Sequence, residues 1–392
     1  MEDAIRKDPV LMLPRELSRH IFSFLPVKCL FRCMPVSKQW HAFLNEIRNS
    51  HNGKLQLLVI SSRRDYYGKK KYRVRSINPD LSLQWVSSSL FTINGQDLRF
   101  FEVEFPPRIM DSCKELVLVS TGTKIVVWNP LTKWFRIVFD PYNNEVCSAQ
   151  DCVEVVGSIC YDVSIKDYKI VLVLRRFANH RHFVFTTRCV SFACFKSNTW
   201  KNLAFPSGVH SSRSSVNFRN TFHWSLCHDV HIRSSPFRNI PIGRNNKIAY
   251  FDPVNDVFKI LPSPEPCHRE EDDWIVGMGI VNDCLCLARL DSETRTVQIL
   301  AMKEYGNGES WFRAFDISLS KFGCDAEDLY TFNFFSLEKN GKVFMKYGHK
   351  RRTLVYDPVK EDVFTVESLL PDSETNLSMC FYAQSCASHM TN

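Results

Sequence analysis

One turn signature recurs along the chain, and its spacing restricts the fold more than any other feature. An aromatic residue, then Asn or Asp, then Pro precedes a further apolar run in "VVWNPLTKWFRIV" from residue 126, "AYFDPVNDVFKIL" from 249 and "LVYDPVKEDVFTV" from 354. Asn or Asp followed by Pro favours a type I turn, because the first side chain bonds the local backbone and the proline ring presets φ. Each copy therefore predicts two short strands joined by a tight turn.

Weaker copies of the signature fill the intervals, and the series keeps a nearly regular step. Turns near residues 78, 129, 196, 252, 303 and 357 are separated by 51, 67, 56, 51 and 54 residues. A repeat of about 50 residues made of short antiparallel strands is typical of a β-propeller, here with about six blades. A large β-sandwich with coincidental turns is the alternative, but a sandwich has no reason to keep this period.

Hairpins between the turns support the repeat. Three predicted hairpins are "VNFRNTFHWSL" from 216, "GIVNDCLCLARL" from 279 and "SLEKNGKVFMKYG" from 336. Closure of such a ring needs its two ends to pair, because an unpaired last blade leaves an open sheet edge. We therefore expect the early strand at 55–61 to lie beside the late strand at 376–383.

Composition indicates a folded, mainly β protein. Of 392 residues, 44% are apolar and 30 are Phe, which suits pleated, half-buried surfaces. No window approaches the ~18 apolar residues of a membrane span, and the first ten residues lack the apolar core of a secretory signal. We expect a soluble protein of the cytoplasm or nucleus with no membrane partner, and its 15 Cys as mostly reduced core residues.

Basic residues cluster in "RRDYYGKKKYRVR" at 63–75, within a chain of formal net charge +8. Such a run beside tyrosines is one way to bind nucleic acid. The alternation on both sides of a Gly also predicts a hairpin with a solvated face. We favour the hairpin and do not expect nucleic acid as a partner.

The N-terminal stretch "LPRELSRHIFSFLPVKCLFRCMPVSKQW" at 13–40 is the one clearly helical pattern. Apolar residues follow at four-residue steps, Pro26 ends the first helix, and Pro35 begins a helix that runs through "VSKQWHAFLNEI". Three short helices cannot bury all of their large side chains among themselves, and each one left wet forgoes roughly 1.5–3 kcal/mol. They need either a partner protein or the rest of this chain as a covering surface.

This stretch resembles an F-box over residues 11–49. Leu13-Pro14 opens it, Leu25-Pro26-Val27-Lys28 follows the first helix, and Val36-Ser37-Lys38-Gln39-Trp40 closes the pattern; Met34-Pro35 departs from it. The resemblance implies docking onto a Skp-type adaptor that hangs on a cullin scaffold with its ring-finger subunit. The residues expected to contact the adaptor are Leu13, Pro14, Leu17, Ile21, Phe22, Leu25, Pro26, Leu30, Val36 and Trp40.

Residues 55–386 resemble the F-box-associated propeller of plant F-box proteins, which is related to the kelch type. Kelch repeats carry paired glycines, whereas this chain has only 14 Gly and no such pairs at the repeat positions. The fold expected is therefore a small N-terminal three-helix F-box followed by an F-box-associated propeller.

No catalytic motif is found in the sequence. It lacks a Gly-rich phosphate loop, a nucleophile elbow and the His-Glu-x-x-His zinc pattern. "CHDVH" at 227–231 and "HRH" at 180–182 would form a zinc site only if the fold brought them together, and polar loop residues are the favoured interpretation. Asp162 and Asp167 flank a predicted hairpin turn with a solvated face. We expect no cofactor, metal or catalytic residue.

The function this predicts is that of a substrate-recognition subunit of a cullin-type ubiquitin ligase, which is not itself a catalyst. A scaffold that binds the adaptor for another purpose and a propeller enzyme remain alternatives. Two polar, arginine-rich segments, one within the long 129–196 step and the other at 227–247, exceed what a blade needs, and loops on a rigid scaffold are where recognition often resides. Arg175, Arg176, Arg233, Phe237 and Arg238 are the candidates for an acidic or phosphorylated target, against the alternative of a basic insertion without a partner.

Overall fold

The computed structural model describes residues 14–23, 33, 36–51, 55–64, 70–77, 85–90, 107–121, 124–130, 134–139, 153–179, 184–204, 210–227, 247–265, 274–291, 293–322, 332–336, 342–347, 352–365 and 374–383. Its helices are α1 (Arg15–Ser23), α3 (Lys38–His51), α4 (Leu319–Phe322) and the 3-10 turn η4 (Gly308–Ser310). No helix in these ranges is long and apolar enough to cross a membrane.

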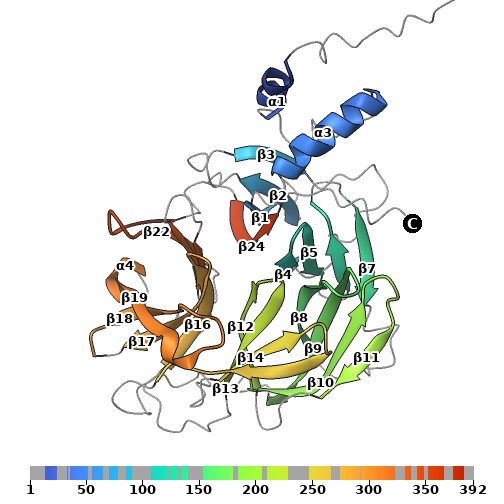
Figure 1. Ribbon diagram of the computed structural model, residues 1–392. Coiled ribbons are helices and arrows are strands. Elements are labelled where there is room, and N and C mark those ends of the chain that lie inside the picture. The colour runs from blue at the N-terminus through green and yellow to red at the C-terminus, as the bar shows by residue number, and fades with distance from the viewer. Residues whose placement is uncertain are drawn as a thin grey trace, which may run out of the picture.

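The rest of the described chain is β-structure, arranged as six four-stranded units that we call blades (Figure 1). Blade 1 holds β24 (Glu374–Ala383), β1 (Leu55–Arg64), β2 (Lys70–Ile77) and β3 (Trp85–Leu90). Blade 2 holds β4 (Arg108–Cys113), β5 (Leu116–Ser120), β6 (Ile125–Trp128) and β7 (Phe135–Phe139), and blade 3 holds β8 (Val153–Asp162), β9 (Asp167–Asn179), β10 (Val184–Cys194) and β11 (Trp200–Leu203).

Blades 4 to 6 have the same order. Blade 4 holds β12 (His210–Phe218), β13 (Thr221–Cys227), β14 (Lys247–Asp252) and β15 (Val257–Leu261). Blade 5 holds β16 (Trp274–Val281), β17 (Cys284–Asp291), β18 (Thr296–Met302) and β19 (Trp311–Ser318), and blade 6 holds β20 (Phe332–Ser336), β21 (Val343–Tyr347), β22 (Arg352–Asp357) and β23 (Asp362–Thr365).

Strands within each blade are antiparallel neighbours, and the first strands of the blades lie toward the centre of the ring. β24 contacts β4, β4 contacts β8, β8 contacts β12, and β12 contacts β16. Blades 5 and 6 join into one eight-stranded sheet because β16 and β20 pair in parallel, so the six blades form five sheets. The predicted propeller fold is confirmed.

The two ends of the propeller close blade 1 together, as the sequence predicts. β1 pairs antiparallel with β24, with Leu55 opposite Ala383 and Leu58 opposite Cys380. β24 thus supplies the first strand of a blade whose other three strands come from the beginning of the propeller. The open edge that a linear array would leave is absent from this blade.

All six predicted turns fall between the third and fourth strand of a blade. In the turn after β14, the Asp252 carboxylate accepts hydrogen bonds from the amides of Val254 and Asn255 at 3.0 and 3.3 Å. Asp357 makes the same pair of bonds to Val359 and Lys360 at 3.1 and 3.2 Å. The turn near residue 78 lies outside the described residues, but β2 and β3 stand on its two sides.

The hydrophobic core lies between neighbouring blades, so the middle strands are buried on both faces. In β9, Ile170 and Leu172 pack toward blade 2 with Leu118, whereas Val171 and Val173 pack toward blade 4. A strand with one buried face alternates apolar and polar residues, whereas a strand buried on both faces is apolar throughout. Burial on both faces therefore explains continuous apolar runs such as "KIVLVL".

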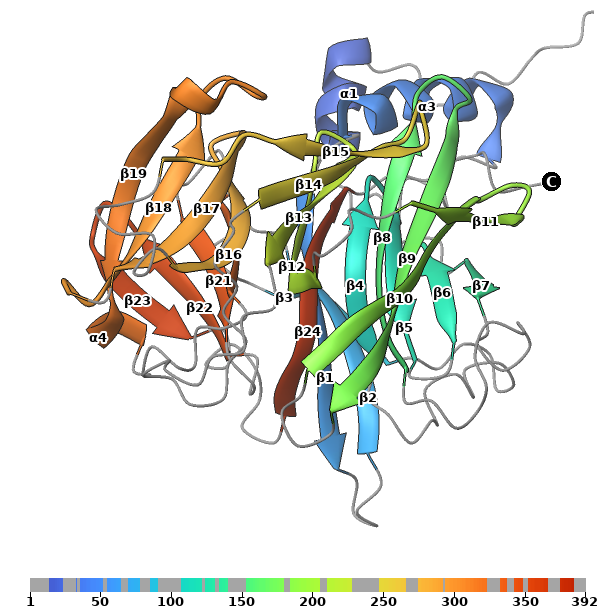
Figure 2. The same cartoon turned by 90° about the horizontal axis from the view of Figure 1, so that it is seen from below.

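The ring has two faces, which the turns distinguish. Turns that join the first to the second strand, and the third to the fourth, lie on one face, which we call the helix-side face because the chain passes from α3 into β1 there. Figure 2 shows α1 and α3 on the side toward which the β8–β9 and β18–β19 turns point. Connections between second and third strands lie on the opposite, far face.

Candidate functional site: the N-terminal helices and the propeller

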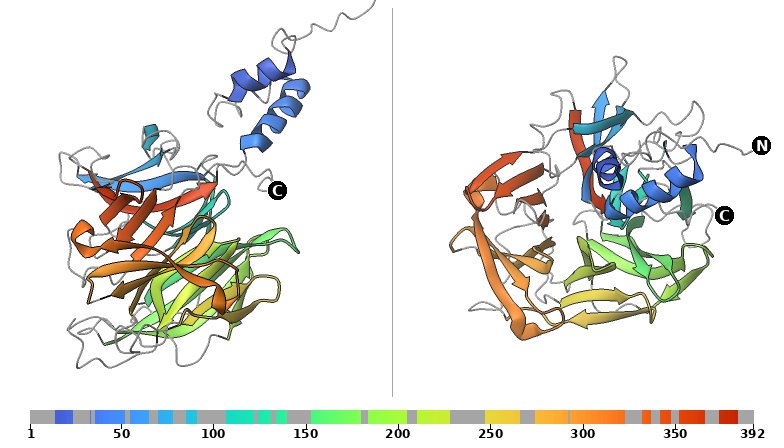
Figure 3. Two further views of the ribbon diagram at one scale, coloured as in Figure 1. Left: turned by 60° about the vertical axis from the view of Figure 1, so that its left-hand side comes forward. Right: turned by 45° about the horizontal axis from the view of Figure 1, so that its top comes forward.

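Helices α1 and α3 pack against each other through aromatic side chains, and Figure 3 shows the pair outside the ring of blades. The ring of Phe22 meets those of Trp40 and Phe43 edge to face, with centroids 5.1 and 5.9 Å apart. Phe22, Phe43 and Leu44 are buried. The pair thus has a small core of its own.

The opposite side of α1 carries apolar side chains that nothing in the described chain covers well. Leu17 and Ile21, one turn apart, are 46% and 44% exposed, and Val36 ahead of α3 is 60% exposed. Residues spaced by four share one side of a helix, so Leu17 and Ile21 form one stripe while Ser18 and Phe22 form the buried one. A stripe of this kind is suited to a protein partner.

One predicted contact residue needs correction. Phe22 was expected on the adaptor surface, but it is only 5% exposed and supports the stripe from inside the helix pair. Trp40 is half-buried for the same reason, since it packs on Phe22. Pro14 is exposed, whereas Leu13, Leu25, Pro26 and Leu30 lie outside the described residues. Adaptor contact by the predicted residues stays a prediction.

Helix α3 begins three residues later than Pro35. The Ser37 hydroxyl accepts a hydrogen bond from the Trp40 amide at 3.1 Å, and the Ser37 carbonyl accepts one from His41 at 2.8 Å. These are the bonds of an N-cap residue, which satisfies amides that have no partner within the helix. Of the predicted middle helix, only Cys33 is described.

The side chains of the predicted target-binding residues lie outside the part of the chain that the structure describes. Arg175 and Arg176 lie in β9, opposite Glu154 and Val153 of β8, but their side chains are outside the described set, as are Arg233, Phe237 and Arg238. The strands that flank both segments end on the far face, in neighbouring blades 3 and 4. Binding of a target there stays a prediction.

A polar layer joins the inner strands of blades 2, 3 and 4, in which Ser158 is buried and Asp111 and Asn217 are half-buried. The Asp111 carboxylate on β4 accepts hydrogen bonds from the Ser158 hydroxyl, from the Ile159 amide at 3.2 Å and from the Asn217 side chain at 3.4 Å. Burial raises the pKa of Asp111 to about 7, although the hydrogen bonds to the backbone and to Asn217 oppose the rise.

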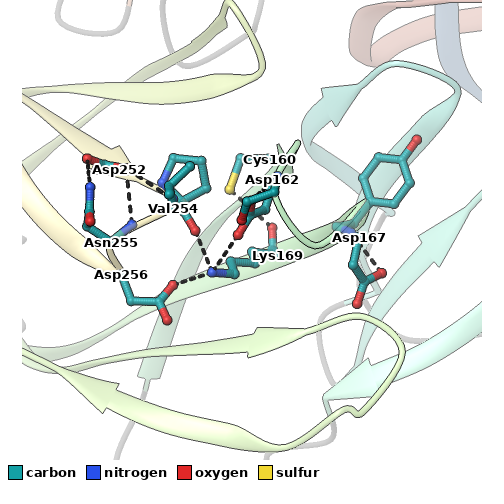
Figure 4. A network of polar contacts seen from close by, with 11 residues as sticks. Cys160, Asp162, Asp167, Lys169, Asp252, Val254, Asn255 and Asp256 are labelled. Carbon is teal, nitrogen blue, oxygen red and sulfur yellow. Dashed lines mark hydrogen bonds and ion pairs between the residues drawn. The ribbon is translucent and has the colours of Figure 1, made fainter.

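A second polar group ties blade 3 to blade 4 (Figure 4). The Lys169 ammonium lies 2.9 Å from Asp162 and 2.5 Å from Asp256, and it donates to the Pro253 carbonyl. Burial lowers the pKa of Lys169, but the bonds to Asp256 and Asp162 outweigh this and leave it above its usual value. The ammonium is therefore charged and fully partnered.

The predicted hairpin between β8 and β9 is confirmed. Its two aspartates were predicted to be solvated, and this prediction is wrong. Asp162 and Asp167 are buried. Asp162 pairs with Lys169, while Asp167 accepts hydrogen bonds from the amides of Tyr168 and Lys196 at 2.8 and 3.1 Å. Their partners explain why two charged side chains can be buried at a turn.

The described residues hold no group of three or more His, Cys, Asp or Glu that could bind a metal ion. "HRH" at 180–182 and most of "CHDVH" at 227–231 lie outside the described residues, and only the backbone of Cys227 is described. Asp111 and Lys169 were not predicted from the sequence, although each is a charged residue in a strand that is otherwise largely apolar, as in "DYKIVLVL".

A helix pair with an exposed apolar stripe, followed by a ring of six blades whose first blade pairs the two ends of the propeller, defines an F-box protein that carries a propeller. Comparison with family models agrees with both parts: the F-box-like model matches residues 10–49, and the F-box associated beta propeller domain matches residues 69–388. The chain belongs to the F-box-associated propeller family, and its F-box indicates binding to a Skp-type adaptor in general.

Three relatives from Arabidopsis thaliana, all named as F-box proteins, match this chain over most of their own length. The F-box protein At1g12855 is 23% identical over 96% of this chain and 85% of its own length. The F-box/kelch-repeat protein At1g12870 is 24% identical over 78% and 71%, and F-box protein CPR1 is 23% identical over 79% and 74%. A solved dipeptidyl peptidase 4 from Porphyromonas gingivalis covers 81% of this chain and 44% of its own at 9% identity, and its TM-score of 0.36 supports no conclusion.

Proposed function

We propose that this protein is the substrate-recognition subunit of a ubiquitin ligase built from a Skp-type adaptor, a cullin and a ring-finger subunit. The helix pair binds the adaptor, and the propeller holds the target. The observation that carries the proposal is the exposed stripe of Leu17 and Ile21 on an F-box helix. Two large aliphatic side chains left in water favour burial against a partner.

The role of the protein in this complex is to bring two proteins together and not to catalyse. A target held beside the charged conjugating enzyme reacts at a raised effective concentration, which needs a rigid connection between the binding surfaces. The propeller offers such a platform, because consecutive blades from blade 1 to blade 6 share buried core clusters.

The test is adaptor binding by the full chain with Leu17→Asp and Ile21→Asp. Two carboxylates in a desolvated interface cost several kcal/mol, so affinity for the purified adaptor should fall by more than about a hundredfold. Calorimetric titration measures the affinity, and thermal unfolding checks that the propeller still melts as in the wild type.

The matched control is Val163→Asp with Ile165→Asp in the β8–β9 turn, where both side chains are also exposed. It introduces the same charges on the propeller and should leave adaptor binding unchanged. Adaptor binding that survives the α1 substitutions would overturn the proposed interface. Native mass spectrometry of the cellular complex then separates the remaining roles: cullin and ring-finger subunits accompany a ligase, whereas the adaptor alone accompanies a scaffold.

A further inference from the structure

Three first-to-second strand turns meet near the centre of the helix-side face. The Tyr161 amide at the end of β8 donates to the Asn220 carbonyl in the β12–β13 turn at 3.2 Å, and the Cys113 thiol at the end of β4 donates to the Asn220 side chain at 3.8 Å. Blades 2, 3 and 4 are therefore joined at this point. Lys114 follows Cys113 and Arg219 precedes Asn220, so both cations adjoin this contact in the sequence.

Both cations rest on aromatic rings. The Lys114 ammonium lies 3.0 Å from the centroid of the Tyr161 ring. The Arg219 guanidinium lies 5.0 Å from the centroid of Phe218 and 5.6 Å from that of Tyr305. Attraction to the ring face holds each cation in place, while Arg219 remains exposed and Lys114 partly exposed.

Neither cation has an ion-pair partner among the described residues. The acid next to Lys114 is Glu115, which is buried and accepts a hydrogen bond from the Tyr168 hydroxyl at 2.7 Å. Burial lowers the pKa of Lys114, although the nearby Cys113 and Glu115 oppose the lowering. A carboxylate of a bound ligand would supply a negative charge beside the Lys114 ammonium or the Arg219 guanidinium.

The aromatic side chains of this patch are held in place from below. Tyr305, which is 37% exposed, shares a hydrogen bond of 2.7 Å with Nε2 of His223. His223 is fully buried, and burial lowers its pKa to about 4, so the imidazole is neutral at physiological pH. The layer around Asp111 lies deeper along the same inner strands. A surface fixed in this way loses little conformational entropy when a ligand binds.

We propose that the patch formed by Lys114, Tyr161, Arg219 and Tyr305 docks an acidic peptide segment of the protein that this chain recruits. The role of that partner as a ubiquitination target rests on the proposed function, whereas the docking itself does not. The patch is separate from the far-face arginines predicted from the sequence.

The surroundings favour a peptide over a more densely charged polyanion. Val163, Ile165 and Val254 at the tips of neighbouring turns are about half-exposed or more. The exposed Glu304 adjoins Tyr305 and would repel a closely spaced row of phosphates. A segment with one or two carboxylates beside apolar side chains matches both features.

The backbone offers substitutions that remove the charge without disturbing the turns. Lys114 and Arg219 both have φ of 52°. Asn tolerates this left-handed region better than either residue, so Lys114→Asn with Arg219→Asn should leave folding intact. Arg295 has φ of 53° in the β17–β18 turn on the far face, and Lys247 is exposed at the start of β14 there. Arg295→Asn with Lys247→Asn is therefore the matched control.

The experiment uses the full chain bound to its adaptor as bait for a library of random peptides. We expect the selected peptides to be enriched in Asp and Glu next to apolar residues. In fluorescence anisotropy, the best of them should bind the Lys114 and Arg219 double variant at least about tenfold more weakly, and the control variant within about twofold of the wild type.

Several outcomes would overturn the docking proposal while leaving the proposed function intact. These are selection of neutral or basic peptides, equal affinity for all three proteins, or loss only in the Arg295 and Lys247 variant, which would move recognition to the far face. Failure of the bait to bind adaptor would instead count against the proposed function, since peptide selection can be repeated on the chain alone.

Discussion

Asp111 illustrates what burial does to a single charged residue in the inner ring of strands. Its folded-state pKa of about 7 lies above the usual 3.8, so the native protein keeps a proton that the unfolded chain releases between these values. The contribution of Asp111 to the stability of the folded protein is therefore complete below pH 4 and is lost as the pH rises through 7.

Replacing Asp111 with Asn should remove this dependence. The Asn side chain keeps an oxygen that can accept from Ser158 and Ile159, and it never has to ionise. The wild type should lose up to about 4 kcal/mol between pH 4 and pH 8 relative to the variant, since one pKa unit corresponds to about 1.4 kcal/mol. Urea unfolding at several pH values measures the difference.

Asp283→Asn is the control, because Asp283 is an exposed aspartate in the β16–β17 turn. Its unfolding curves should follow those of the wild type at every pH. Parallel pH profiles for the wild type and the Asp111 variant would mean that water reaches the Asp111 carboxylate and keeps its pKa near normal.

At the residue scale, the sequence shows that one side of a helix is apolar, but it does not show which of these apolar side chains are buried inside the helix pair and which face outward. Leu17, Ile21 and Phe22 all belong to the predicted apolar stripe, yet only Phe22 turns inward. The reason is that Phe22 meets Trp40 and Phe43 of α3, and the angle at which α3 crosses α1 is not a property of either helix alone. Only the packed pair distinguishes the inner from the outer side.

At the scale of elements, the turns were predictable and the contacts between blades were not. An Asn or Asp followed by Pro acts within four residues, so the turns after Trp128, Phe251 and Tyr356 could be located from local chemistry. Lys169 instead meets Asp256 from a position 87 residues away. The pattern of apolar and polar residues within one strand does not predict which residue of the next blade a side chain will contact.

Lys169 should therefore be important for the association of blades 3 and 4. Lys169→Met removes the ammonium and leaves the buried Asp162 without its ion-pair partner, with only the hydrogen bonds from Ser164, which should cost about 3–5 kcal/mol of unfolding free energy. Adding Asp162→Asn to the same chain should recover part of that loss, because the uncompensated charge disappears. Chemical denaturation of the two variants measures both effects.

The matched comparison is Lys259→Met, which removes an exposed lysine 2.5 Å from Asp252 within blade 4. Solvent screens such a pair, so stability should change little. If the Lys169 and Lys259 variants are equally stable, or if Asp162→Asn makes the Lys169 variant worse, the ion-pair group around Lys169 does not have the role assigned to it.

On the scale of the whole molecule, closure depends on one strand from the end of the chain. Cys380 and Tyr382 of β24 share a core with Leu58 and Ile60 of β1 and with Val117 of blade 2. The strand therefore contributes both a hydrogen-bonded edge and part of the core between blades 1 and 2. Pairing of the two ends was predictable because an unpaired last blade would leave an open sheet edge.

Truncation before Asp372 removes β24 and should prevent the ring from closing. β1 would then present an unpaired edge of ten residues, from Leu55 to Arg64, and the side chains of Leu58 and Ile60 would be uncovered. Open apolar edges pair with other chains, so we expect soluble aggregates in size-exclusion chromatography and no cooperative thermal transition.

Removal of only residues 388–392 is the control, and it should leave the melting temperature unchanged because it spares all of β24. A truncated chain that remains monomeric and melts cooperatively would show that blade 1 is stable with three strands and that the terminal strand is not what holds the ring together.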